Sequence, residues 1–154
     1  MIRVGVISDT HGLLRPQALA ALAGSDYIVH GGDIGNAGIL ADLAAIAPLT
    51  VVRGNNDKGP WASDVPHSAQ LQIGNVCIHA IHDIATIDID PVAAGVQIVI
   101  YGHSHRPRAE QRGSVLYLNP GSAGPRRFSL PVSVATLEIE GGAIKARIIE
   151  LDIA

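Results

Sequence analysis

Residues 2–12 read IRVGVISDTHG, and this stretch is the strongest indication of the fold. The apolar run at residues 4–7 predicts a buried strand near the amino terminus. The run stops at a polar group that contains Asp9 and His11, which lie two positions apart and can both turn toward one metal from a single loop. The chain therefore opens with a buried strand whose carboxyl end carries metal-binding side chains.

The same pattern, a polar group directly after an apolar run, recurs along the chain. The groups together supply carboxylates, an amide and imidazoles, which can hold two borderline divalent metals side by side. They are Asp9-Thr10-His11, Gly32-Asp33, Gly54-Asn55-Asn56-Asp57, His82-Asp83 and Gly102-His103-Ser104-His105. Most of them, taken alone, are also typical of a turn or a helix cap. Their joint occurrence after strand-like runs predicts a metal site.

The remaining pattern predicts strands with two early helices. Helical spacing of apolar residues indicates a helix from Pro16 to the stop at Gly24 and another from Ile39 to Pro48, and residues 91–94 suggest a weak third. The expected strands are residues 4–7, 27–29, 49–52, 71–73, 76–81, 96–101, 115–118, 132–139 and 144–151. Strand–helix–strand units come early and hairpins late, which predicts an α/β (α+β) fold of two mixed sheets packed face to face with helices outside.

This order of elements also predicts where the polar groups meet. In strand–helix units the loops at the carboxyl ends of the strands gather at one edge of the sheet. Asp9, Asp33, Asn55 and His103 each follow such a strand. We therefore expect these side chains to converge despite their separation in the sequence.

Composition narrows the class of protein. The 154 residues predict one domain, 1–154, and 47% hydrophobic residues with few aromatics can fill one aliphatic core. The formal charge of −3 gives no overall attraction for nucleic acid or anionic membranes. Cys77 is the only cysteine, which excludes an internal disulfide and a thiolate cluster. Without a recognisable signal peptide or a bilayer-spanning apolar run, a cytoplasmic location is expected.

The ordered motifs resemble those of the calcineurin-like metallophosphoesterases, and within them the small bacterial and archaeal phosphodiesterases. The resemblance covers about residues 4–127 and includes ISDTHG at 7–12, HGGD at 30–33, VRGN at 52–55 and NPGS at 119–122. It implies the metallophosphoesterase fold, a four-layer sandwich of two mixed sheets flanked by helices. It also implies hydrolysis of small or nucleotide-like phosphodiesters by a hydroxide held between two metals.

The resemblance implies a role for each ligand. One metal is expected on Asp9, His11, Asp33 and His105, and the other on Asp33, Asn55, His82 and His103, with Asp33 as the bridge. Manganese is the usual metal of such enzymes, and iron, nickel or zinc stay open, because oxygen and nitrogen ligands do not select one of them. The expected catalytic residues are Asp33, Asn55, His103 and, as a hydrogen-bond partner of the ligands, Asp57.

Two neighbouring positions refine this assignment. His79 and His82 lie three apart on a strand and face opposite sides, so one of them is expected to bind the ion, and His82 is preferred because it stands at the strand end before Asp83. His30 is expected to brace Asp33. Asn56 stands where many of these enzymes carry a histidine that protonates the leaving oxygen or holds the phosphate. An amide can donate a hydrogen bond but cannot give up a proton near pH 7, so Asn56 is expected to bind substrate without acting as an acid.

Basic residues gather after the last metal motif. Arg127, and less so Arg126, follows the NPGS loop and is predicted to grip substrate phosphate. Arg106, Arg108 and Arg112 are interpreted as a solvated loop. His67 is assigned no role.

Two alternatives to a phosphodiesterase stay open. One is a non-catalytic protein-interaction module on the same metal-binding scaffold, against which the complete ligand set argues. The other is a nuclease, which the acidic balance and the short chain disfavour. The expected partner is a small phosphodiester substrate, with no membrane and no nucleic acid. The natural substrate and a homo-oligomeric state are left open.

Overall fold

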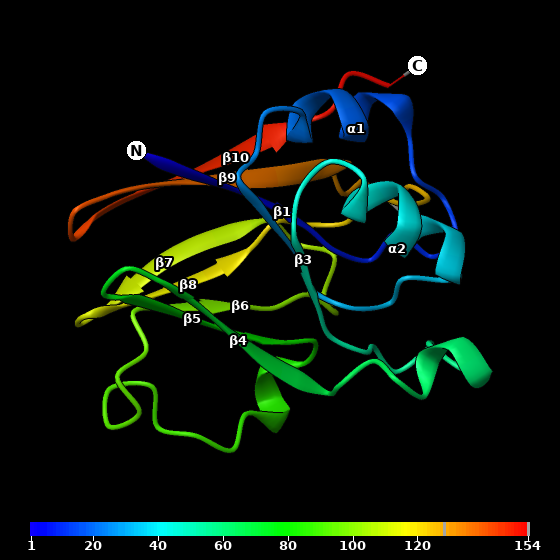
Figure 1. Cartoon of the computed structure of the whole chain (residues 1–154). Helices are drawn as coiled ribbons and strands as arrows, with labels where there is room; N and C mark the ends of the chain where they lie inside the picture. Colours follow the sequence, from blue (N-terminus) through cyan, green and yellow to red (C-terminus); the bar gives the residue numbers. More distant parts are fainter. Residues whose placement is uncertain (128, 154) are drawn as a thin grey trace.

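The computed structural model describes residues 1–127 and 129–153, in which two five-stranded sheets pack face to face (Figure 1). The first sheet has the order β10 (Ala143–Glu150), β9 (Ser133–Glu140), β1 (Ile2–Ile7), β2 (Tyr27–His30) and β3 (Leu49–Val51). The second has the order β4 (Ser68–Ile73), β5 (Val76–Ile81), β6 (Ile98–Ile100), β8 (Val115–Asn119) and β7 (Arg108–Arg112). The two mixed sheets confirm the predicted fold class.

Both sheets combine a parallel centre with antiparallel additions. Strands β1, β2 and β3 run parallel, and the β9–β10 hairpin joins β1 in the antiparallel sense. Strands β5, β6 and β8 run parallel, with β4 and β7 antiparallel at the two edges. The carboxyl ends of neighbouring parallel strands therefore lie together in each sheet, which brings the loops that follow them to one side of the sandwich.

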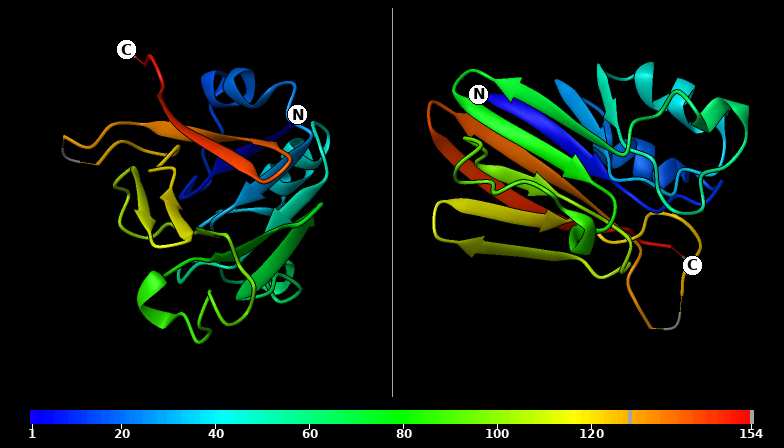
Figure 2. Two further views of the ribbon diagram at one scale, coloured as in Figure 1. Left: turned by 90° about the vertical axis from the view of Figure 1, so that its left-hand side faces the viewer. Right: turned by 90° about the horizontal axis from the view of Figure 1, so that it is seen from below.

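Two short helices connect the parallel strands of the first sheet. Helix α1 (Pro16–Leu22) begins with proline at its first position, where the missing N–H leaves no hydrogen bond unmade. Helix α2 (Ala37–Ala44) begins after Asn36, whose side chain accepts a hydrogen bond from the backbone N–H of Ile39. Both helices lie over the outer face of the first sheet (Figures 1 and 2).

The buried apolar side chains of the described residues form three clusters. Valine, isoleucine, leucine and alanine from both sheets form the central core between them, including Val6, Ile78 and Leu137. Leu22 and Leu43 belong to a second cluster, formed where the two helices pack on the first sheet.

The outer face of the second sheet differs from the prediction. Residues 84–96 cover it, with one 3-10 turn, η2 (Ile84–Thr86), and apolar contacts to Cys77 and Val99. The weak helix expected at residues 91–94 is a turn, in which the backbone N–H of Ala94 donates to Asp90 O at 2.9 Å and Gly95 has a φ of 74°. The flanking helices of the sandwich therefore lie on the first sheet. In the described parts of the chain, no helix has both the length and the apolarity that crossing a bilayer requires.

Candidate metal centre

Loops from both sheets converge at one place with their metal-binding side chains. Asp9 and His11 follow β1, and Asp33 follows β2, all in the first sheet. His82 follows β5 and His105 lies in the loop after β6, both in the second sheet. An atom of Asp9, of Asp33 and of His105 lies within 3.7 Å of His11 Nε2.

The first group of ligand atoms belongs to Asp9, His11 and His105, whose atoms lie within 4.8 Å of one another. His11 Nε2 lies 3.2 Å from His105 Nε2 and 3.7 Å from Asp9 Oδ1. His105 Nε2 lies 3.5 Å from the same carboxylate oxygen. Two imidazoles and a carboxylate thus point their lone pairs at one small volume.

The second group belongs to Asp9, Asp33 and His82. His82 Nε2 lies 3.2 Å from Asp33 Oδ2 and 3.9 Å from Asp9 Oδ1. Asp33 Oδ2 also lies 3.7 Å from His11 Nε2, so it faces both groups. Asp9 belongs to both groups of ligand atoms and Asp33 to the second, and the assignment of Asp33 as the bridging ligand stays a prediction.

Asn55 and His103, the other two predicted ligands, lie beside the second group. His103 Nδ1 lies 3.3 Å from Asn55 Oδ1, and the rings of His82 and His103 meet edge to face with centroids 5.3 Å apart. His103 Nε2 lies 4.0 Å from Asp83 Oδ2. Both side chains are exposed here, and their assignment as ligands stays a prediction.

The backbone at the centre is held in an uncommon conformation. Among the residues that the structure describes, the non-glycine residues with positive φ are Asp9 (55°), His11 (46°), Asp33 (54°), His103 (73°) and His105 (63°). Left-handed φ angles are disfavoured for residues with a side chain and cluster at functional sites. All of these residues are predicted ligands, so the backbone strain of this fold is concentrated at the candidate centre.

Glycines make room for the carboxylates. A Cβ at Gly54 would collide with the Asp33 carboxylate, and a Cβ at Gly102 would collide with Ser8 and Asp9. Both positions are therefore restricted to glycine, because the neighbouring loops approach too closely for any side chain.

Buried polar atoms without partners mark the same place. In the described residues, Asp9 Oδ1 and His82 Nε2 are buried and form no hydrogen bond. His82 Nδ1 donates to Gly31 O at 2.8 Å, which leaves the Nε2 lone pair facing Asp33. A backbone carbonyl on the far ring nitrogen is the usual support of a metal-bound histidine. The orphaned atoms and the mixed oxygen and nitrogen donors fit divalent metal ions.

Electrostatics keeps both carboxylates ionised. Burial alone would raise the pKa of Asp9, but His105, His11, His82 and Ser8 together hold this pKa far below its usual range. Burial opposes ionisation of Asp33 in the same way, and its pKa is nevertheless lowered by His82 and by the backbone N–H of Asn56. Negative charge is thus available for cations at both positions.

Asn56 and Asp57 support the ligand loops. The backbone N–H of Asn56 donates to Asp33 Oδ1 at 2.9 Å, and its side-chain Nδ2 donates to Asp33 Oδ2 at 3.1 Å. Asp57 is buried and accepts from Ile34 N at 2.8 Å, Gly35 N at 3.1 Å and Gly54 N at 2.9 Å. Asn56 therefore orients the Asp33 carboxylate, while Asp57 ties the loop of Asp33 to the loop of Asn55.

The two remaining buried histidines lie apart from the ligand atoms. His30 accepts a hydrogen bond from Gly32 N at 3.0 Å through Nδ1 and pairs through Nε2 with Thr10 Oγ1 at 3.0 Å. It thus braces the backbone on both sides of the centre. His79 lies beside Gln70 with its Nδ1 3.4 Å from Gln70 Nε2, and it belongs to neither group of ligand atoms.

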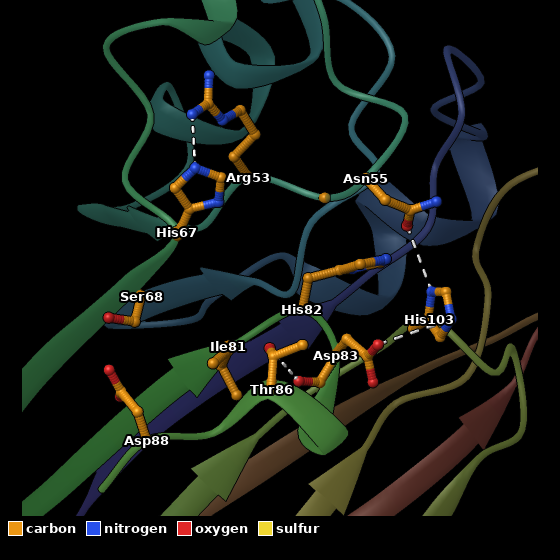
Figure 3. Close-up of a pocket in the computed structure, with 11 residues that line it drawn as sticks. Arg53, Asn55, His67, Ser68, Ile81, His82, Asp83, Thr86, Asp88 and His103 are labelled. Carbon is orange, nitrogen blue, oxygen red and sulfur yellow. Dashed lines mark hydrogen bonds and ion pairs between the residues drawn. The ribbon is translucent and has the colours of Figure 1, made fainter.

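A pocket of about 440 Å³ adjoins the second group (Figure 3). His82 and His103 line it together with Arg53 and His67 from the segment that follows β3. Arg127 is exposed on its loop and is not among the described residues that line this pocket. The basic side chain that the structure brings to the pocket is Arg53.

Comparison with known proteins decides the family. A family model described as the calcineurin-like phosphoesterase superfamily domain matches residues 2–142. The chain belongs to this superfamily. The chain is 32% identical to a probable metallophosphoesterase of Methanothermobacter thermautotrophicus in an alignment of 158 positions, which covers 95% of this chain and 91% of the relative.

Other relatives match most of the chain in sequence or in fold. The phosphoesterase is 26% identical to phosphodiesterase YfcE of Escherichia coli, with 90% of this chain and 88% of the relative covered. These relatives place it among the small bacterial and archaeal phosphodiesterases of the superfamily. It is also similar in fold to Vps29 of Chaetomium thermophilum, with a TM-score of 0.78 at 18% identity and coverage of 98% and 97%.

Sequence reasoning missed Arg53 and His67, two of the residues that line the pocket. Arg53 stands inside the VRGN motif, and His67 lies fourteen positions further along the chain, where no apolar run ends. The structure brings them together because Arg53 N donates to Pro66 O at 2.8 Å, which closes the intervening segment into a loop. Their only signal in the sequence is that both flank this glycine- and proline-containing segment.

Proposed function

We propose that this protein is a metal-dependent phosphodiesterase that hydrolyses small or nucleotide-like phosphodiesters at the candidate centre. The observation that carries the proposal is the coincidence of backbone strain and chemistry. Every described non-glycine residue with positive φ is an aspartate or histidine of the predicted ligand set. Strain of this kind persists where a site requires it.

The proposed ligand assignment follows the geometry and the resemblance together. Asp9, His11 and His105 would hold one ion, and His82, Asn55 and His103 the other. Asp33 would serve both ions, since its Oδ2 faces His11 and His82. Bound ions would supply Lewis-acid chemistry, polarising phosphoryl oxygens and lowering the pKa of water. Manganese is the ion that we propose first.

The other residues act by positioning. Asn56 donates hydrogen bonds to both carboxylate oxygens of Asp33, one from its backbone N–H and one from its side-chain amide. The side-chain amide therefore orients Asp33 and does not act as an acid. Because an amide gives up no proton near neutral pH, departure of the alcohol depends on its own acidity. We expect fast turnover of aryl diesters and slow turnover of alkyl diesters.

Turnover of bis-p-nitrophenyl phosphate tests the proposal. Protein stripped by a chelator should be inactive and should regain activity with manganese, because the ligand set holds the only chemistry at this centre that can activate water. Folding is checked by circular dichroism in the same samples. A folded protein that shows no turnover with manganese, iron, nickel or zinc contradicts the proposal.

The same experiment separates the alternative of a non-catalytic interaction module. The likeness to Vps29 at 18% identity concerns the fold alone and favours neither reading. A module of that kind would bind metal at this centre without turnover, whereas a phosphodiesterase shows both. Metal content and turnover measured on one sample therefore decide between them.

A further inference from the structure

The pocket beside the candidate centre reaches a buried histidine of that centre. The His82 side chain is 5% exposed and lines the space together with His103, while its Nε2 lies 3.2 Å from Asp33 Oδ2 and 3.9 Å from Asp9 Oδ1. Figure 3 shows Arg53 and His67 at the top of the view, Ser68 and Asp88 close to each other at its lower left, and Thr86 and Asp83 below His82. A substrate whose phosphorus lies at the centre has room for one ester group here.

Arg53, the arginine in the pocket wall, already donates hydrogen bonds to other residues of the protein. Arg53 donates from Nη1 to Ala62 O at 3.3 Å and from Nη2 to His67 Nε2 at 2.6 Å. Both contacts tie the guanidinium to its own loop and use two of its five N–H donors. Arg53 is therefore held in place as part of the wall.

The lining also carries negative charge, from Asp83 and Asp88. Asp83 Oδ1 accepts from Ala85 N at 3.0 Å, and this contact fixes the carboxylate so that Oδ2 faces His103 at 4.0 Å. Asp88 is exposed in the same lining, and the Thr86 hydroxyl lies between them in the chain. The lining thus offers two carboxylates and two hydroxyls, the second being that of Ser68.

Phenylalanine, tyrosine and tryptophan are missing from the described lining. A nucleobase bound here would find no aromatic ring on which to stack, apart from imidazoles. A hydroxyl-bearing group would find acceptors in both carboxylates and in the hydroxyl oxygens. The chemistry of the wall therefore favours a polyol or sugar over a base.

We propose that this pocket binds the uncharged, hydroxyl-bearing ester group of a phosphodiester, and that Asp83 and Asp88 discriminate against phosphomonoesters. The inference rests on the proposed phosphodiesterase function and adds the substrate class to it. A diester carries one negative charge, whereas a phosphomonoester carries close to two at pH 7. The two carboxylates repel the second charge and accept hydrogen bonds from vicinal hydroxyls.

Three substrates with one leaving group test the proposal: p-nitrophenyl phosphate, propyl p-nitrophenyl phosphate and 2,3-dihydroxypropyl p-nitrophenyl phosphate. We expect kcat/KM to be highest for the dihydroxypropyl diester and lowest for the monoester. Asp88→Asn should raise kcat/KM of the monoester roughly fivefold at low salt, since one partly screened charge is removed. It should lower kcat/KM of the dihydroxypropyl diester relative to that of the propyl diester, because the propyl group offers no hydroxyl for the lost acceptor.

Asp42→Asn is the matched control, because it makes the same charge change on an exposed residue of α2, outside the described lining. A binding measurement adds a readout that does not depend on turnover. Calorimetry with inorganic phosphate on the metal-loaded proteins should show tighter binding to Asp88→Asn than to the parent and to Asp42→Asn.

The outcomes separate this inference from the proposed function. If none of the three substrates is hydrolysed by the metal-loaded parent, the phosphodiesterase function itself fails. If the diesters are hydrolysed but Asp88→Asn and Asp83→Asn change neither the substrate ratios nor phosphate binding, the pocket has no such selectivity. An equal change in Asp42→Asn would trace the effect to net charge and would also overturn the inference.

Discussion

Replacing Asp57 by asparagine changes one oxygen to an NH₂ group while the shape of the side chain is kept. The carboxylate is buried and accepts three backbone N–H groups, from Ile34 and Gly35 on Oδ1 and from Gly54 on Oδ2. An asparagine can retain the two bonds on Oδ1 only by pointing its NH₂ at the Gly54 N–H. A flipped amide would lose two bonds in place of one, so the first arrangement is preferred.

The magnitude follows from this count. A hydrogen bond to a charged group contributes about 1.5–3 kcal/mol, and an unsatisfied buried donor costs about 1–3 kcal/mol. Asp57→Asn should therefore lower the free energy of unfolding by about 2 kcal/mol, and Asp57→Ala, which loses all three acceptors, by about 4 kcal/mol. For a chain of this length 2 kcal/mol corresponds to about 4–8 °C in Tm.

Thermal and urea unfolding in the presence of a chelator measure this loss without a metal contribution. Asp64→Asn is the control, because Asp64 is exposed on the same segment of chain. The loops that Asp57 joins carry Asp33 and Asn55, so metal content should fall together with Tm. An Asp57→Asn protein with the Tm of the parent would refute the role of Asp57 as the link between these loops.

Three further predictions concern the residues around the centre. Asp33→Asn should reduce metal content at both sites, whereas Asn55→Ala should mainly weaken one; elemental analysis decides, and two tightly held ions in Asp33→Asn would contradict the bridging assignment. Burial lowers the pKa of His30 to about 4, so its neutral form is favoured in the folded state and stability is lost as pH falls from about 6.5 to about 4, by up to about 3 kcal/mol. His30→Asn, which keeps an acceptor for Gly32 N, should show a smaller loss over that pH window in urea unfolding with chelator; equal slopes would exclude His30 as the cause. Asn56→His should accelerate diesters of poor leaving groups more than those of good ones; a native rate that hardly depends on leaving-group pKa would show that another residue supplies the proton.

The strands that position the centre could be predicted because they are buried on both faces. Val4 and Ile7 lie in a continuous apolar run, and the first polar side chains after it mark the point where the strand leaves the core. The choice of His82 over His79 used the alternation of a strand, and the structure places His82 in a ligand group and His79 outside both groups. Local pattern suffices where burial and alternation act together.

Strand β7 was missed because its sequence, RAEQR, contains no apolar run. Its side chains interact along the strand and with β8: Glu110 pairs with Arg108 at 3.1 Å and Arg112 at 3.0 Å, and the Arg112 guanidinium lies 4.5 Å above the Tyr117 ring. The sequence interpretation treated these arginines as a solvated loop. The contact with Tyr117 and the backbone pairing are known only when the register with β8 is known.

The meeting of Arg53 and His67 in the pocket lining was beyond prediction for a related reason. Arg53 and His67 meet because the chain between them returns on itself, and the hydrogen bond from Arg53 N to Pro66 O that fixes this return has no periodic signal. The weak helix at residues 91–94 failed because Gly95 adopts a φ of 74° and turns the chain after a single helical turn. Loop closure depends on long-range contacts that a local pattern does not contain.

The candidate centre takes its side chains from both halves of the sandwich. Asp9, His11 and Asp33 come from the first sheet, and His82 and His105 from the second. An ion held by His11 and His105 would link two layers that also meet through the aliphatic core and through hydrogen bonds such as that from His82 Nδ1 to Gly31 O. Above the dissociation constant, each tenfold rise in free ion concentration then adds about 1.4 kcal/mol to the stability of the folded chain. Scarcity of the ion would shorten the lifetime of the protein against proteolysis as well as its activity, so that the metal supply of the cell would set how much of it persists.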